Sequence, residues 1–275
     1  SLVWVMVAMC LLVLGGCSAP SDSAGPASSK DTPANVLRFS RNSDPKTLDP
    51  SLCTDIASAT VIYHLFEPLA RLDANGQPQP AGAVSWEHSD DYKVWTFKLR
   101  PEAKWSNGDP VVADDYLYAL RRILDKRTNS QYASMVYNFL EGGRAYYDSD
   151  GADTARFGAR ATDPLTLELT LVQPTPFFLS VVTHSSWYPL HEKTVAPNPT
   201  RWALAPETLV GNGPFVLEAW LPKDRVILKR SATYWESTSI KLDQIVFKTI
   251  ENESTEMAAF EAGDIDVTSR VSPVE

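Results

Sequence analysis

The stretch WSNGDPVVADDYLYAL, residues 105–120, places a turn, a proline and two adjacent carboxylates directly before an amphipathic run. The Asn107-Gly108 pair suits a tight turn, and the proline two residues later fixes the backbone beyond it. Asp114 and Asp115 fall in the first turn of a helix, where negative charge interacts favourably with the helix dipole. The alternating oxygen ligands and closing Glu of a calcium loop are absent from this stretch. We therefore interpret it as architecture, a turn followed by a helix, and not as a metal site.

Alternating and helical periodicities surround this stretch. Residues 94–100, VWTFKLR, and 165–171, LTLELTL, put apolar side chains on one face and polar side chains on the other, as half-buried strands do. Residues 215–220 and 225–230 flank a four-residue turn and predict a hairpin. Further helices are predicted over 56–69, 116–124 and 253–263, and Pro68 should end the first of them. Further strands are predicted over 36–40 and 264–267. The chain is therefore predicted to have a mixed α/β fold.

Composition narrows the function classes. The 275 residues carry a formal charge of -9, with 44% apolar and 21% charged residues, which is typical of a globular protein with a sizeable core. No Lys/Arg-rich run interrupts the acidic balance, so nucleic acid and anionic membrane surfaces are not expected as electrostatic partners.

The first 35 residues differ from the rest. Leu2 to Leu14 is almost unbroken apolar sequence and leads into Gly15-Gly16-Cys17, so residues 1–17 read as a signal peptide that is too short to span a bilayer. LVLGGC resembles a bacterial lipobox, which implies lipidation of Cys17. The chain begins with Ser1 and lacks a basic residue before the apolar run, so we expect that the start of the gene product is missing. Residues 18–35, rich in Ser, Pro and Ala, are predicted to be a flexible linker.

Chemistry-bearing motifs are sparse. The sequence has no Gly-x-Ser-x-Gly elbow, no His-Glu-x-x-His helix, no paired cysteines at zinc spacing and no phosphate-binding glycine loop, so we expect no metal and no cofactor. His184-Ser185-Ser186 offers a base beside hydroxyl groups, but a loop histidine is the simpler interpretation. Cys53 would be left without a disulfide partner, and we predict that it is a small buried apolar side chain.

An ordered set of motifs resembles the extracytoplasmic solute-binding proteins of peptide ABC importers, within the oligopeptide-binding subgroup. These motifs are TLDPS, LFEPLA, DDYKVWTFKLRPEAKWSNGDPVVADDYLYALRRI, SQYAS, VGNGPFVLEAW, VILKRSATYW and FEAGDIDVT, and they cover the chain from about residue 37 to 275. The resemblance implies a two-lobed periplasmic-binding-protein fold (class II, peptide-binding cluster), of which only the first lobe and its extra domain are present.

The resemblance also implies an organisation and partners. Lobe I would comprise residues 36–67 and 192–270, the extra domain 68–191, and the missing second lobe would start at 271–275. Members close around an oligopeptide outside the cytoplasmic membrane and deliver it to a permease that ATPase subunits drive. The implied protein is a monomeric, lipid-anchored binding protein in the periplasm or at the cell surface, and not an enzyme.

Ligand contacts carry over by position. Thr54, Asp55 and Ile56 match a family loop that touches the ligand, and Tyr132 in SQYAS matches a ligand-contacting tyrosine. The segment 269–271 (Ser269, Arg270, Val271) matches a hinge-proximal strand that pairs with the peptide backbone. Thr54 replaces an acidic residue, which puts a preference for basic side chains in doubt. Arg270 replaces a small polar residue and would favour an acidic ligand group, or else be a solvated hinge charge.

Several alternatives stay open at this point. Within the family, the ligand could be a dipeptide, a murein peptide, a nickel chelate or a sugar, since a fold does not fix a ligand. Outside it stand an exported hydrolase, which needs a competent nucleophile and base, and a purely structural surface lipoprotein.

Overall fold

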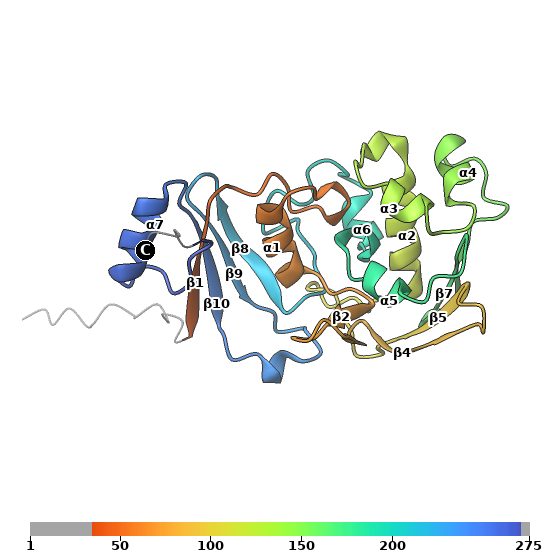
Figure 1. Cartoon of the computed structure of the whole chain (residues 1–275), viewed down its shortest axis with the longest axis horizontal. Coiled ribbons are helices and arrows are strands. Elements are labelled where there is room, and N and C mark those ends of the chain that lie inside the picture. The colour runs from red at the N-terminus through yellow and green to blue at the C-terminus, as the bar shows by residue number, and fades with distance from the viewer. Residues whose placement is uncertain (1–34, 271–275) are drawn as a thin grey trace, which may run out of the picture. The chain divides into compact units, whose positions relative to one another are not determined.

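The computed structural model describes residues 35–270, which belong to one compact unit. Its largest sheet has the order β1-β10-β9-β8, built from β1 (Val36–Arg41), β10 (Gln244–Thr249), β9 (Arg225–Arg230) and β8 (Phe215–Leu221). β1 and β10 are parallel, and the other pairs are antiparallel. Helix α1 (Ile56–Leu65) packs beside β8 (Figure 1). The predicted hairpin at residues 215–230 is confirmed.

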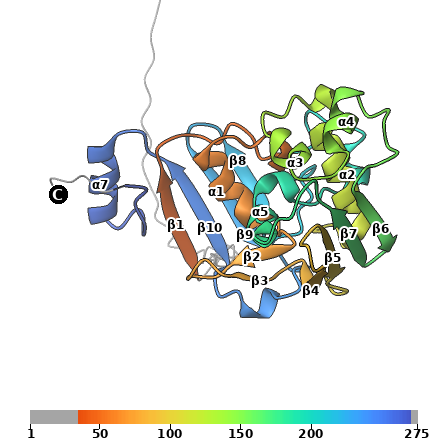
Figure 2. The same ribbon diagram turned by 45° about the vertical axis from the view of Figure 1, so that its right-hand side comes forward.

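A second sheet is antiparallel throughout and has the order β4-β5-β7-β6. It comprises β4 (Ala83–His88), β5 (Val94–Leu99), β7 (Thr166–Thr170) and β6 (Ala159–Asp163), with α2 (Ala113–Leu124) against β6 and β7 (Figure 2). Trp95, Phe97 and Leu99 are buried, whereas the exposed Lys98 lies between them. The alternation predicted from the sequence is therefore confirmed, as is the mixed α/β fold.

Short elements complete the structure. β2 (Ala70–Leu72) and β3 (Pro78–Pro80) form an antiparallel pair. The short helices are α3 (Ser134–Tyr137), α4 (Gly143–Asp148), α5 (Phe178–Val181), α6 (Glu192–Val195) and α7 (Glu253–Glu261), and the 3₁₀ helices are η1 (Pro50–Leu52), η2 (Lys126–Thr128), η3 (Ser185–Trp187) and η4 (Ser237–Ser239). None of the helices between residues 35 and 270 is long and apolar enough to cross a membrane.

The stretch at residues 105–120 is architectural, as predicted. Gly108 has φ +92°, which a tight turn requires of its glycine. Asp115 lies in the first turn of α2, where its Oδ2 accepts hydrogen bonds from the backbone N–H of Val112 (2.9 Å) and from Nε1 of Trp105 (2.9 Å). This carboxylate compensates for Val112, whose side chain cannot cap the helix.

Two predicted elements were too long. α1 ends at Leu65 and not near Pro68, because Phe66 is extended (φ −131°) and the N–H of Glu67 bonds to Asn212 Oδ1 instead of continuing the helix. Phe66 and Leu69 are nevertheless buried. The predicted strand at 264–267 is reduced to a single bridge between Val267 and Phe39 of β1.

The strands of each sheet come from one side or the other of the predicted domain division. All strands of the β1-β10-β9-β8 sheet come from 36–67 and 192–270, and all strands of the other two sheets come from 68–191. The division into two domains stays a prediction. The signal peptide, Cys17, nearly all of the linker and the segment 271–275 lie outside the described residues.

A buried ion pair joins three distant parts of the sequence. Arg122 of α2 donates from Nη1 and Nη2 to Asp49 Oδ1 (3.0 Å) and Oδ2 (2.6 Å). Trp202 Nε1 also donates to Asp49 Oδ2 (3.2 Å), and Arg122 reaches the carbonyl of Pro199 (3.0 Å). The side chains of Arg122 and Asp49 are only 8% and 5% exposed. Removing one partner would leave a buried charge without compensation.

We expect Arg122→Met to lower the free energy of unfolding by about 3–5 kcal/mol, because the buried Asp49 carboxylate loses its counter-charge. Urea titration followed by circular dichroism measures this change. The matched control is Arg127→Met, since the Arg127 side chain is 91% exposed beside Asp125 and should have no measurable effect. Equal stability of the two variants would contradict the role given to the buried pair.

Candidate functional site

Thr54 and Asp55 lie in the loop between η1 and α1, and Ile56 is the first residue of α1. Asp55 is the N-cap of α1, and its carboxylate accepts from the N–H (2.9 Å) and the hydroxyl (2.8 Å) of Ser58. This capping fixes the start of the helix and leaves the side chain of Ile56 pointing into solvent, 85% exposed. Cys53, just before the loop, is buried as predicted, and burial raises the pKa of its thiol. The loop is thus a rigid support for one exposed apolar side chain.

Tyr132 lies close to the same part of the molecule. Ser130 Oγ donates to the carbonyl of Ser51 in η1 (2.6 Å), which holds the Tyr132 segment beside η1. The half-exposed Tyr132 ring meets the ring of His184 edge-on, with centroids 5.2 Å apart. Since η3, which His184 precedes, contacts η1, α1 and α3, the structure gathers these segments around η3. We call Thr54, Asp55, Ile56, Tyr132 and His184 the Thr54–Tyr132 surface.

Ser269 and Arg270 lie elsewhere, beside β1 and α7. The carboxylate of Glu256 accepts from the N–H (2.6 Å) and hydroxyl (2.9 Å) of Ser269 and from the hydroxyl of Ser40. Arg270 donates to the carbonyl of Glu251 (2.8 Å), and its Nε lies 3.8 Å from Glu256 Oε2. Arg270 is thus engaged by this chain, with its side chain 41% exposed. Val271 lies outside the described residues.

Arg41, which sequence reasoning missed, contacts α1 and directly follows Ser40, which bonds to Glu256. It ends β1, is 3% exposed, donates from Nη1 to the carbonyl of Ala57 in α1 (3.3 Å) and lies over the ring of Phe247. Its Nε and Nη2 make no hydrogen bond with any described residue. Burial lowers the pKa of Arg41 to about 10, although Asp44 and Asp55 oppose this effect. An arginine at a strand end is ordinarily exposed, so the sequence carried no signal of this burial.

His184 and Ser186 are the closest approach to a catalytic pair. Nδ1 of His184 lies 2.6 Å from Ser186 Oγ but also accepts from the backbone N–H of Ser186 (3.2 Å), so the histidine caps η3. Within residues 35–270 no carboxylate is hydrogen-bonded to His184, and Ser186 is buried. The pair therefore lacks the third group that would orient a base, and its hydroxyl is out of reach of a substrate. In the same range, no three His, Cys, Asp or Glu side chains are grouped to hold a metal ion.

Comparisons with known proteins show which proteins this chain resembles. The model of the family described as bacterial extracellular solute-binding proteins, family 5 Middle, matches residues 77–275. The dipeptide-binding protein DppE of Bacillus subtilis is 36% identical over 258 residues, which cover 92% of this chain and 47% of that protein. The periplasmic oligopeptide-binding protein OppA of Escherichia coli is 34% identical over 272 residues, covering 96% of this chain and 50% of that protein.

Solved structures agree with these sequence matches. The structure of Haemophilus influenzae OppA in complex with the peptide RPPGFSPFR superposes with a TM-score of 0.82 at 34% identity, covering 87% of this chain and 46% of that one. The chain thus spans about half the length of the relatives it matches.

The Glu256 cluster should be sensitive to acid. Burial alone would raise the pKa of Glu256, but hydrogen bonds from Ser40 and Ser269 and the charge of Arg270 outweigh burial and lower it. A lowered pKa in the folded state means that the stabilisation is present above about pH 4.5, the ordinary value, and is lost as the pH falls through the lower folded value.

We expect Glu256→Gln to lose this acid sensitivity, so that its free energy of unfolding falls less steeply than that of the unmodified chain as the pH decreases below 4.5. Urea titrations at several pH values measure both slopes. Glu253→Gln is a matched control on the same helix, because Glu253 is only half-buried and accepts no side-chain hydrogen bond from a described residue. Identical slopes for Glu256→Gln and the unmodified chain would contradict this assignment.

Proposed function

Because the chain belongs to the bacterial extracellular solute-binding proteins of family 5, as its motifs predicted, we propose that it forms the peptide-contacting part of the substrate-binding subunit of an oligopeptide ABC importer. The observation that carries this proposal is the Thr54–Tyr132 surface, where the exposed side chains of Ile56 and Tyr132 stand on segments that buried contacts hold in place. Such a surface suits reversible binding.

The chemistry of this surface suits a ligand of varied sequence. Ile56 and the Tyr132 ring provide apolar contact without demanding a particular partner, while Thr54 adds a hydroxyl group in place of a charge. An extended peptide always presents backbone N–H and carbonyl groups, so affinity can come from the backbone while the side chains vary. Ser269 and Arg270 would contribute at the hinge side, as the family resemblance implies. That the ligand is an oligopeptide and not a dipeptide is our proposal, since relatives named for dipeptides and for oligopeptides match this chain about equally well.

The proposal requires no chemistry on the ligand, in keeping with a family of solute-binding proteins rather than enzymes. His184, which caps η3, and the buried Ser186 give the hydrolase alternative no support. The location we propose is outside the cytoplasmic membrane, with a lipid on Cys17 as anchor and a permease with its ATPase subunits as partners. Nothing structural is described for Cys17, and its lipidation stays a prediction from the sequence.

The natural gene product, purified gently without refolding, should carry a spread of extra masses in native mass spectrometry that fragment to peptides. Ile56→Asp should then weaken peptide binding about tenfold in calorimetry, equivalent to losing roughly 1.4 kcal/mol of apolar contact, without unfolding the protein. Val172→Asp is the matched control, since Val172 is 52% exposed and lies outside the Thr54–Tyr132 surface. A protein without bound peptides that also fails to bind a mixed peptide pool would refute the proposed function, and equal affinities of the two variants would refute the assigned surface.

A further inference from the structure

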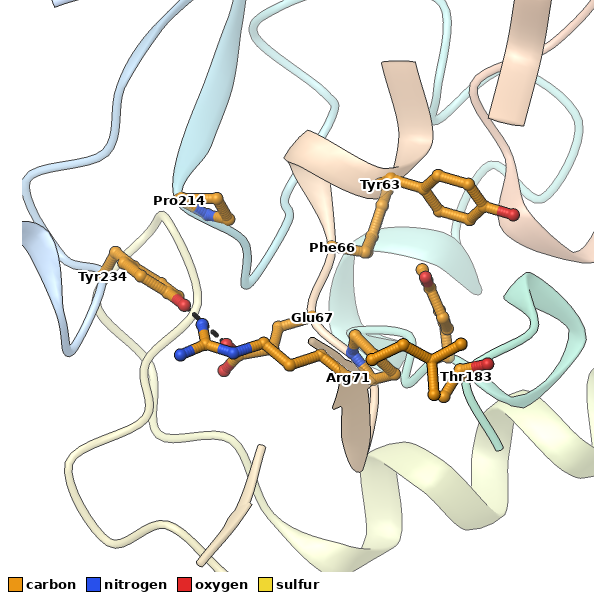
Figure 3. A pocket seen from close by; sticks show the side chains of 10 residues that line it. Tyr63, Phe66, Glu67, Arg71, Thr183, Pro214 and Tyr234 are labelled. Carbon is orange, nitrogen blue, oxygen red and sulfur yellow. Dashed lines mark hydrogen bonds between the residues drawn. The ribbon is translucent and has the colours of Figure 1, made fainter. Parts of the chain in front are cut away.

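A separate pocket lies at the opposite end of α1 from Asp55. Its walls come from the last turn of α1, from β2, from the residues on both sides of η3 and from the two connections that flank β8 and β9. The pocket has a volume of about 390 Å³, which is within the range of small-molecule sites. Figure 3 shows Glu67, Arg71 and Tyr234 converging on one side, with Tyr63 and Thr183 on the other. None of the residues of the Thr54–Tyr132 surface lines it.

The walls are mainly apolar. Phe66 and Tyr188 are almost completely buried, and Leu72 and Tyr63, 47% and 51% exposed, stand at the mouth. The rings of Tyr63 and Tyr188 lie against each other with centroids 6.3 Å apart. This lining would cover the apolar body of a ligand and remove it from water.

The charged side chains around the pocket already have hydrogen-bond partners. Both carboxylate oxygens of Glu67 accept hydrogen bonds, one from the hydroxyl of Tyr234 (2.5 Å) and one from Nε1 of Trp235 (2.8 Å). The guanidinium of Arg71 binds Glu236 through two nitrogens, each 3.2 Å from the same oxygen. Because Arg71 is held by Glu236 and the partners of Glu67 are both neutral, the pocket offers no free cation to an anionic ligand and favours a neutral one over it.

Tyr188 brings a hydroxyl group to the pocket. Tyr188 is 4% exposed, yet its hydroxyl makes no hydrogen bond with any described residue. Burial raises the pKa of Tyr188, so the hydroxyl keeps its proton and can donate it. A ligand that brings an acceptor into the pocket can therefore take the hydrogen bond of this hydroxyl. The hydroxyl of Tyr63, which lines the same pocket, also makes no hydrogen bond with a described residue.

We propose that this pocket is a second binding site, which takes a small neutral molecule with an apolar body and a carbonyl oxygen. The body lies against Phe66 and Leu72, and the carbonyl oxygen accepts the hydrogen bond of Tyr188. The site does not depend on the peptide-binding function, because its walls and the Thr54–Tyr132 surface share no residue.

Acetophenone, an aromatic ring with one carbonyl group, is the probe, and saturation-transfer NMR on the 275-residue chain measures its binding. We expect saturable binding with a Kd of about 1 mM or tighter, as its size allows. Tyr188→Phe removes only the hydroxyl group and should raise the Kd about fivefold. Leu72→Trp fills the mouth from an exposed position and should abolish binding without unfolding the chain. Tyr132→Phe, an equally small change on the Thr54–Tyr132 surface, should leave the Kd unchanged.

Benzoate tests the neutrality of the ligand, since it has the same ring but a negative charge. It should bind more weakly than acetophenone because it would be buried beside Glu67. No saturable acetophenone binding, or binding that Leu72→Trp leaves intact, would overturn the proposed site. An unchanged Kd in Tyr188→Phe would overturn the role of the hydroxyl, and tighter binding of benzoate would overturn the neutral class of ligand.

Discussion

The buried pair of Asp49 and Arg122 is the contact on which the rest of the structure depends. It joins η1, near the start of the chain, to α2 and to the segment around Trp202, which lie 73 and 153 residues further on. An ion pair this deeply buried recovers its desolvation cost only when its geometry is good and further hydrogen bonds support it. Here Trp202 and the N–H of Ser51 donate to Asp49, and the carbonyl of Pro199 accepts from Arg122, whose Nε alone has no partner among the described residues. Because the pair tolerates little displacement, it fixes η1, and with η1 the loop that begins α1.

The position of the Thr54–Tyr132 surface follows from that constraint. Asp49 holds η1, η1 leads into Thr54, and the hydroxyl of Ser130 ties the segment of Tyr132 to the same 3₁₀ helix. Tyr132 and Ile56 are therefore exposed side chains on anchored segments. Such anchoring lowers the conformational entropy that the protein loses when it binds a peptide. At the other end of α1, Glu67 performs a comparable role, since its carboxylate and backbone tie the helix terminus to Tyr234, Trp235 and Asn212. One helix thus separates two surfaces of different chemistry.

Local pattern predicted much of the fold, and resemblance supplied the site. The alternation in 94–100 and 165–171 predicted β5 and β7 because each strand has one buried and one exposed face, and the turn at Asn107-Gly108 follows from the chemistry of glycine. The pairing of Asp49 with Arg122 was not predictable, because nothing local relates residues so far apart. The length of helix α1 was overestimated because the N–H of Glu67 bonds to Asn212, which lies 145 residues away in the sequence. Arg41 and Glu256 were missed for a similar reason, since their burial arises only when β1, α1 and α7 come together.

Hydrogen exchange of the natural gene product, with and without a mixed peptide pool, tests the central claim most directly, because it locates the ligand on the chain. The account predicts slower exchange in residues 54–60 and 130–134 when peptide is present. Protection confined to residues 63–72 and 234, or no protection anywhere in the described part of the chain, would contradict it.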